Sequence, residues 1–122
     1  MKNLIEAIKK SSAKPAQIKS QWEISNSYCF NNSFLGFSGH FPGYPILPAV
    51  MQLLLAQLLI EEQKGHKIEV ISIEKAKFLS EIRPNDPVTV ICTNADTDNG
   101  QRSKVKIVSG DRAVSSFTIC FR

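Results

Sequence analysis

The segment from Gly39 to Pro48 constrains the fold more than any other part of the chain. It holds three prolines and two glycines in ten residues. Proline fixes φ and removes an amide donor, whereas glycine permits backbone conformations that other residues avoid. The segment therefore predicts a rigid loop of specific shape rather than a helix or a central strand. Pro48 fits the first position of a following helix, where a missing N–H costs nothing.

The residues after this loop predict a buried helix. From Ala49 to Ile60 the only polar side chains are Gln52 and Gln57. A helix that is apolar on nearly every face is surrounded by protein. We expect this helix to continue to about Glu62 and to stop at Gly65.

The rest of the chain predicts strands, apart from a short amphipathic helix over residues 2–10. A strand is expected from Ile18 to Phe30, where the apolar residues Trp22, Ile24, Tyr28 and Phe30 share one parity. Four further strands are expected at 68–79, 87–95, 101–109 and 112–121, separated by turn residues. This order predicts an α+β fold in which an antiparallel sheet wraps around the central helix. Residues 1–16 form an N-terminal helix and linker, and residues 17–122 form the main domain.

Composition excludes several classes of protein. The chain has 122 residues, enough for one domain, and a formal net charge of +4. That charge is far below the dense basic stripes of a dedicated nucleic-acid binder. The longest apolar stretch, Ile46 to Ile60, is too short to cross a bilayer, and the first residues do not resemble a signal peptide. We therefore expect no nucleic-acid partner and no membrane span.

The three cysteines, Cys29, Cys92 and Cys120, are odd in number and far apart. They predict reduced core residues, with no disulfide framework and no metal site. A soluble, cytoplasmic protein follows as the expected class.

His40 is the candidate catalytic residue because it lies on the rigid loop that leads into a helix N-terminus. Free N–H groups there carry roughly half a positive charge. A histidine beside such donors is a reasonable general base next to an oxyanion site. The alternative is a histidine that only packs or caps the loop. The second histidine, His66, is expected to be exposed after the helix.

The segment Gly39–Val50, GHFPGYPILPAV, resembles the active-site segment of the 3-hydroxyacyl-(acyl carrier protein) dehydratases, which usually reads G-H-F-P-x-x-P-x-x-P-G-V. Residues 73–86 and 117–122 are similar to later strands of that family. The resemblance covers about residues 20–122, and extends to dehydratase-like proteins of aryl polyene pathways. It implies a hot-dog fold, a homodimer with sites at the interface, and a substrate carried on phosphopantetheine with no other cofactor.

The resemblance also implies roles for individual residues. His40 would act as the base at C2 of a 3-hydroxyacyl thioester, and the carbonyl of Ile46 would orient its ring. Ala49 stands where the family has a glycine whose N–H holds the thioester carbonyl. Leu54 stands where the family has the Glu or Asp that helps to expel the hydroxyl as water. Gln57 lies one position from the family's helix glutamine.

The departure at Leu54 leaves three hypotheses open. The first is a dehydratase-like enzyme of fatty acid or related lipid synthesis, with water or an acid from elsewhere replacing the missing carboxyl; Glu61 is too far along the helix to do so. The second is a catalytically weak subunit that binds acyl thioesters, and the third is a hot-dog thioesterase. The basic residues Arg102, Lys104 and Lys106 predict either a solvated strand face or a docking patch for the acidic acyl carrier protein.

Overall fold

The computed structural model describes residues 2–37, 43 and 45–122. The chain forms one six-stranded antiparallel sheet with the order β1-β2-β4-β5-β6-β3. The elements are α1 (Lys2–Lys10), β1 (Gln17–Ser20), β2 (Glu23–Cys29), the short 3-10 helix η1 (Leu35–Phe37), α2 (Ala49–Lys64), β3 (Val70–Phe78), β4 (Pro87–Thr97), β5 (Gly100–Ser109) and β6 (Arg112–Phe121).

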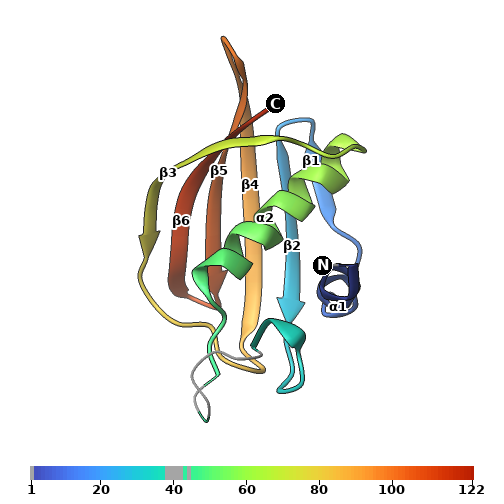
Figure 1. Ribbon diagram of the computed structural model, residues 1–122, viewed down its shortest axis with the longest axis vertical. Coiled ribbons are helices and arrows are strands. Elements are labelled where there is room, and N and C mark those ends of the chain that lie inside the picture. The colour runs from blue at the N-terminus through green and yellow to red at the C-terminus, as the bar shows by residue number, and fades with distance from the viewer. Residues whose placement is uncertain (1, 38–42, 44) are drawn as a thin grey trace.

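The sheet curves around α2, which crosses one of its faces (Figure 1). Residues of one parity on β4, Val88, Val90 and Cys92, face the helix and are fully or almost fully buried. The helix covers them with side chains that include Leu55 and Leu59. This is the hot-dog architecture expected from the sequence, and the expected helices and the four late strands are confirmed within a few residues.

The ends of α2 follow from local chemistry. Pro48 is the N-cap residue, one position earlier than predicted, with an extended backbone at φ −64° and ψ 157°. Gly65 ends the helix with φ 78°, in the left-handed region that glycine adopts without a Cβ penalty. Its amide donates to the Glu61 carbonyl at 2.9 Å. The predicted stop at Gly65 is therefore confirmed.

The expected single strand from Ile18 to Phe30 is wrong. A turn at residues 21 and 22 splits it into the antiparallel pair β1 and β2, in which Ile18 lies opposite Ile24. The Ser20 hydroxyl stabilises this turn by accepting a hydrogen bond from the Trp22 amide at 3.0 Å. Trp22 consequently sits in the turn, 37% exposed, instead of in the core.

Helix α1 packs on the same core as the sheet. Ile8 is 2% exposed, and the Cys29 amide donates to the Ser11 carbonyl just after the helix. The predicted division between residues 16 and 17 stays a prediction. No helix in the described part of the chain is long and apolar enough to cross a membrane.

Candidate functional site

The segment before α2 is held from two sides. The Leu47 amide donates to the carbonyl of Ile82 at 2.8 Å, and the Leu47 carbonyl accepts a hydrogen bond from the Gln52 side chain at 3.4 Å. Leu47 itself is 3% exposed. Leu47 therefore fixes the position from which the chain enters the helix.

Two amide donors in the first turn of α2 have no acceptor in the part of the chain that the structure describes. The amides of Met51 and Gln52 donate to the Pro48 carbonyl at 3.0 and 3.2 Å. The amides of Ala49 and Val50 have no acceptor among the described residues, and both residues are exposed. The first turn carries no acidic side chain that would neutralise these donors. The helix start can therefore hold an anionic or carbonyl oxygen, which is the chemistry expected at Ala49.

The other predicted site residues lie at different places relative to this helix start. His40 lies outside the described residues, which stop at Phe37 and resume with Gly43 and then Pro45. Ile46 is half-buried three residues before Ala49, so these two positions are close along the chain. The structure brings Ile46 and Ala49 to one end of α2.

Leu54 lies on the flank of α2, half-buried and packed against the core. No carboxyl replaces it nearby on the helix. The Glu61 carboxylate is about 10 Å further along the axis at 1.5 Å per residue. It accepts hydrogen bonds from the Ile68 amide at 3.0 Å and from Gln57 at 3.5 Å. Both Glu61 and Gln57 are thus engaged at the C-terminal half of the helix.

Sequence reasoning missed a buried polar pair beneath the helix start. Gln52 is 3% exposed, and its side-chain carbonyl accepts a hydrogen bond from the Ser115 hydroxyl at 2.6 Å. Ser115 is on β6 and is 2% exposed. Together with the Gln52 contact to Leu47, this pair connects the sheet, the helix and the loop. A glutamine in an apolar helix was a visible signal, but nothing in the sequence pointed to Ser115.

Replacing Gln52 by leucine should lower the free energy of unfolding by about 1–3 kcal/mol, because the Ser115 hydroxyl would remain buried without its acceptor. Chemical denaturation of Gln52→Leu, Ser115→Ala and the double variant would measure this. The double variant should lose less than the sum of the single losses, since both changes remove one interaction. Strictly additive losses would mean that the two side chains do not act as a pair.

Two other buried reactive groups are held in their neutral forms. Burial raises the pKa of the Cys92 thiol to about 12. Burial, followed by the nearby Glu62 charge, raises the pKa of Tyr28 to about 12. Neither group is a nucleophile or base near neutral pH.

The cysteine prediction holds only in part. All three cysteines are free, and Cys92 is buried, but Cys29 is exposed and Cys120 is half-buried. Cys29 lies at the end of β2, where the side-chain alternation of a strand turns it away from the core. The described residues contain no group of three His, Cys, Asp or Glu side chains that could hold a metal ion.

Comparison with protein families gives a match over residues 16–117 to the family model described as ApeI-like, ApeI dehydratase. The chain is 36% identical over 63 residues to a 3-hydroxyacyl-(acyl-carrier-protein) dehydratase FabZ of Chlamydia trachomatis. This alignment covers 44% of this chain and 41% of that protein. It is 44% identical over 63 residues to the FabZ dehydratase of Nitratiruptor sp., covering 41% of this chain and 43% of the relative. These matches thus span less than half of each relative.

Solved structures share the fold. A chain of the dehydratase heterocomplex ApeI:P from Xenorhabdus doucetiae superimposes with a TM-score of 0.77 at 20% identity, covering 88% of this chain and 93% of that one. The PaaI protein of E. coli superimposes with a TM-score of 0.71 at 12% identity, covering 100% of this chain and 91% of that one. At these identities the likeness concerns the fold alone.

Proposed function

Because this chain belongs to the ApeI-like dehydratase family, we propose that it removes water from 3-hydroxyacyl thioesters and yields trans-2-enoyl thioesters. The acyl group would be carried on the phosphopantetheine of an acyl carrier protein, and no other cofactor would take part. The observation that carries this proposal is the family match over residues 16–117, which includes the proline-rich loop and the start of α2.

In this proposal the loop and the helix start divide the chemistry between them. His40 takes the proton from C2, the electron pair of that C–H bond forms the C2–C3 double bond, and the C3–O bond breaks. The free amide of Ala49 holds the thioester oxygen, where negative charge develops as the proton leaves. The Ile46 carbonyl orients the His40 ring. Two observations support these roles: the amides of Ala49 and Val50 have no acceptor within the described ranges, and hydrogen bonds fix the position of Leu47.

The leaving hydroxyl must gain a proton to depart as water. Leu54 has no proton to give, and the Glu61 carboxylate is engaged with the Ile68 amide. We therefore propose that water or an acid from another chain supplies this proton. Loss of one acid–base group typically costs about 10²- to 10⁴-fold in rate, so a slow enzyme is expected.

The test is to incubate the protein with 3-hydroxyacyl thioesters on a carrier protein and to follow the products by mass spectrometry. Loss of water from the acyl group supports the dehydratase. Free acid would instead make the chain a thioesterase. If the protein binds the thioester but does not convert it, the chain would be an acyl-thioester-binding subunit. The replacement of the acid by Leu54 favours this alternative.

A homodimer is part of the proposal because the chain leaves apolar surface uncovered along one side. Strand β3 lies at an edge of the sheet and pairs only with β6 (Figure 1). Ile71 on β3 is 50% exposed and Ile73 is 36% exposed, while Val50 on α2 is 67% exposed. An apolar stretch of an edge strand is a template for pairing with another chain, and on β3 this stretch is the first half, before Glu74 and the bulge at Lys75. Pairing of β3 with β3 of a second copy would cover this edge.

The Ile73→Lys variant should convert the dimer to a monomer at micromolar concentration, because a charge would replace apolar contact area at the paired edge. Sedimentation velocity measures the change. The matched control is Ile18→Lys on β1, at the opposite edge of the sheet, where the side chain is 57% exposed. If the unmodified protein sediments as a monomer, or if both variants dissociate equally, the β3 interface is wrong.

The partners and location follow the same reasoning. The carrier protein is proposed as the partner that delivers the substrate, and no nucleic-acid partner is proposed. The cytoplasmic location expected from the unpaired cysteines remains part of this proposal.

A further inference from the structure

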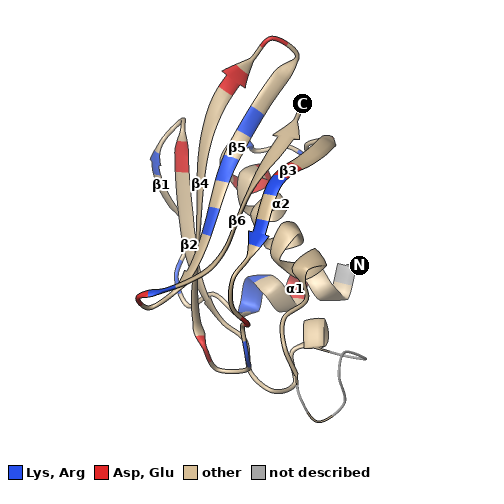
Figure 2. Cartoon of the chain, turned by 90° about the vertical axis from the view of Figure 1, so that its left-hand side faces the viewer, with Lys and Arg blue, Asp and Glu red and all other residues tan. Residues whose placement is uncertain are grey.

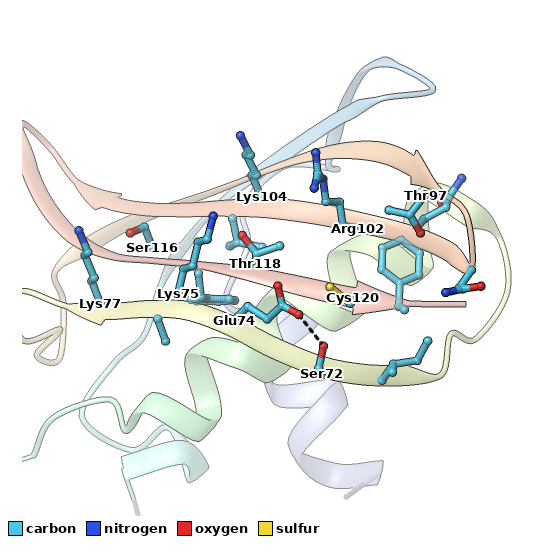
Figure 3. Close-up of a pocket in the computed structure, with 17 residues that line it drawn as sticks. Ser72, Glu74, Lys75, Lys77, Thr97, Arg102, Lys104, Ser116, Thr118 and Cys120 are labelled. Carbon is cyan, nitrogen blue, oxygen red and sulfur yellow. Dashed lines mark hydrogen bonds between the residues drawn. The ribbon is translucent and has the colours of Figure 1, made fainter.

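The face of the sheet that points away from α2 carries a groove with basic walls. Its volume is about 930 Å³, and strands β3, β5 and β6 line it. The floor consists of the small β6 side chains Ser116, Thr118 and Cys120, all half-buried (Figure 3). We call this feature the outer groove.

Strand register places long basic side chains on both sides of this floor. On β5, Arg102 lies opposite Cys120, Lys104 opposite Thr118 and Lys106 opposite Ser116. On β3, Lys77 lies opposite Ser116 and Glu74 opposite Thr118. Figure 2 shows the β5 and β3 cations as two separate blue columns. Short side chains between two rows of long ones make a trough rather than a flat charged face.

A bulge in β3 produces the second basic wall. Glu74 and Lys77 are three residues apart, yet their partners Thr118 and Ser116 on β6 are two apart. The extra residue is accommodated where Lys75 has φ 54°, a left-handed conformation uncommon for a non-glycine residue. A bulge re-aims the side chains that follow it. Without it, Lys77 would face the side opposite to Glu74.

The basic residues of the outer groove have no ion-pair partner within the described part of the chain. The ion pairs there join Lys19 to Glu23, Arg83 to Glu81, Arg112 to Asp86 and Arg122 to Glu69. Glu74, the one acidic residue lining the groove, accepts a hydrogen bond from the Ser72 hydroxyl at 3.2 Å. The groove therefore presents four exposed cations, Lys75, Lys77, Arg102 and Lys104, against a single carboxylate.

We propose that the outer groove docks an acidic, carboxylate-rich segment of a partner protein. Alternate residues on a strand are spaced by about 6.6–6.8 Å, so the β5 cations form a row that matches alternate side chains of an extended acidic peptide. The floor hydroxyls of Ser116 and Thr118 offer additional hydrogen bonds. Exposed ionic contacts of this kind steer association and are sensitive to salt.

The groove fits a protein better than a nucleic acid. Glu74 lies opposite Thr118, in the middle of the positive surface. Its carboxylate would repel the phosphates of a nucleic acid that ran along the groove. The lining aromatic residues Phe117 and Phe121 are each 2% exposed, so they offer no surface for base stacking. A discrete pattern of charges suits a protein segment with its own discrete pattern of carboxylates.

The test measures binding of a labelled oligoglutamate peptide by fluorescence anisotropy at low and high salt. The variant Lys77→Glu with Lys104→Glu should bind about tenfold more weakly than the unmodified protein, because two exposed contacts become repulsive. The matched control, Lys10→Glu with Lys14→Glu, makes the same change in net charge at exposed positions outside the groove and should bind almost normally. Arg102→Gln with Lys75→Gln provides a second groove variant with no residue in common with the first.

Three results would overturn the proposal: no binding of the peptide, equal weakening by the groove and control variants, or tighter binding of a single-stranded oligodeoxythymidine of equal charge. The peptide carries no thioester. Its failure to bind would therefore leave the proposed dehydration untouched, and absence of dehydration would leave the docking proposal untouched.

Discussion

The His40→Ala variant is expected to lose dehydration activity by about 10²- to 10⁴-fold, the range that a general base contributes. In the proposed reaction His40 removes the C2 proton, and no other described group is suited to do so near the start of α2. The thiol of Cys92 and the phenol of Tyr28 are buried with pKa values raised to about 12. Initial rates with a 3-hydroxyacyl carrier-protein substrate measure the loss.

His66→Ala is the matched control, because it removes the other histidine of the chain. His66 is exposed beyond the end of α2, and its ring contacts the Lys67 carbonyl at 2.9 Å. The control should keep full activity. Equal activity in His40→Ala and His66→Ala would mean that another residue is the base and that the loop motif does not mark the catalytic centre.

The parts of the fold with a strong periodic pattern could be predicted from the sequence. Between Ala49 and Ile60 the chain is almost wholly apolar, and this alone indicates a helix inside the molecule. The late strands alternate apolar and polar residues, and glycine or asparagine occupies the turns between them. In these regions local propensity, burial pattern and turn chemistry agree.

The hairpin of β1 and β2 could not be read in the same way. Its turn contains no glycine, proline or asparagine, and the shared parity of Trp22 and Ile24 suggested one continuous strand. The turn instead depends on a hydroxyl of Ser20 and on pairing between the two strands, which has no single-residue signal. The hydrogen bond between Gln52 and Ser115 could not be predicted either, because no single residue signals a pair between distant parts of the sequence.

At the candidate site the sequence predicted that a helix begins next to Pro48, and the structure has this helix start, where the Ala49 amide has no acceptor among the described residues. The roles of His40, Ile46, Ala49 and Leu54 stay predictions. The bulge at Lys75 had no such signal, because the sequence around it reads as regular strand. It changes which face Lys77 occupies, and so the outer groove becomes visible only in three dimensions.

The Leu54→Glu variant is expected to raise dehydration by about tenfold or more, within the range that acid–base groups contribute. Leu54 occupies the position at which related dehydratases, by the resemblance of the loop, carry an acid. Its side chain is half-buried against the core, so a new carboxyl would lose part of its hydration. That loss favours the neutral form and raises the carboxyl pKa, and the protonated form is the one that can give a proton to the leaving hydroxyl.

The cost of Leu54→Glu is a loss of folding stability, on the order of a few kcal/mol if the carboxyl finds no hydrogen-bond partner. Thermal melts must therefore accompany the rate measurements. Leu54→Gln is the matched control, since it has nearly the same shape and polarity but no acidic proton, and it should give no gain in rate. A folded Leu54→Glu protein that is no faster than the parent or the glutamine control would show that more than an acid is missing. In that case the chain would be better described as a subunit that binds acyl thioesters without transforming them.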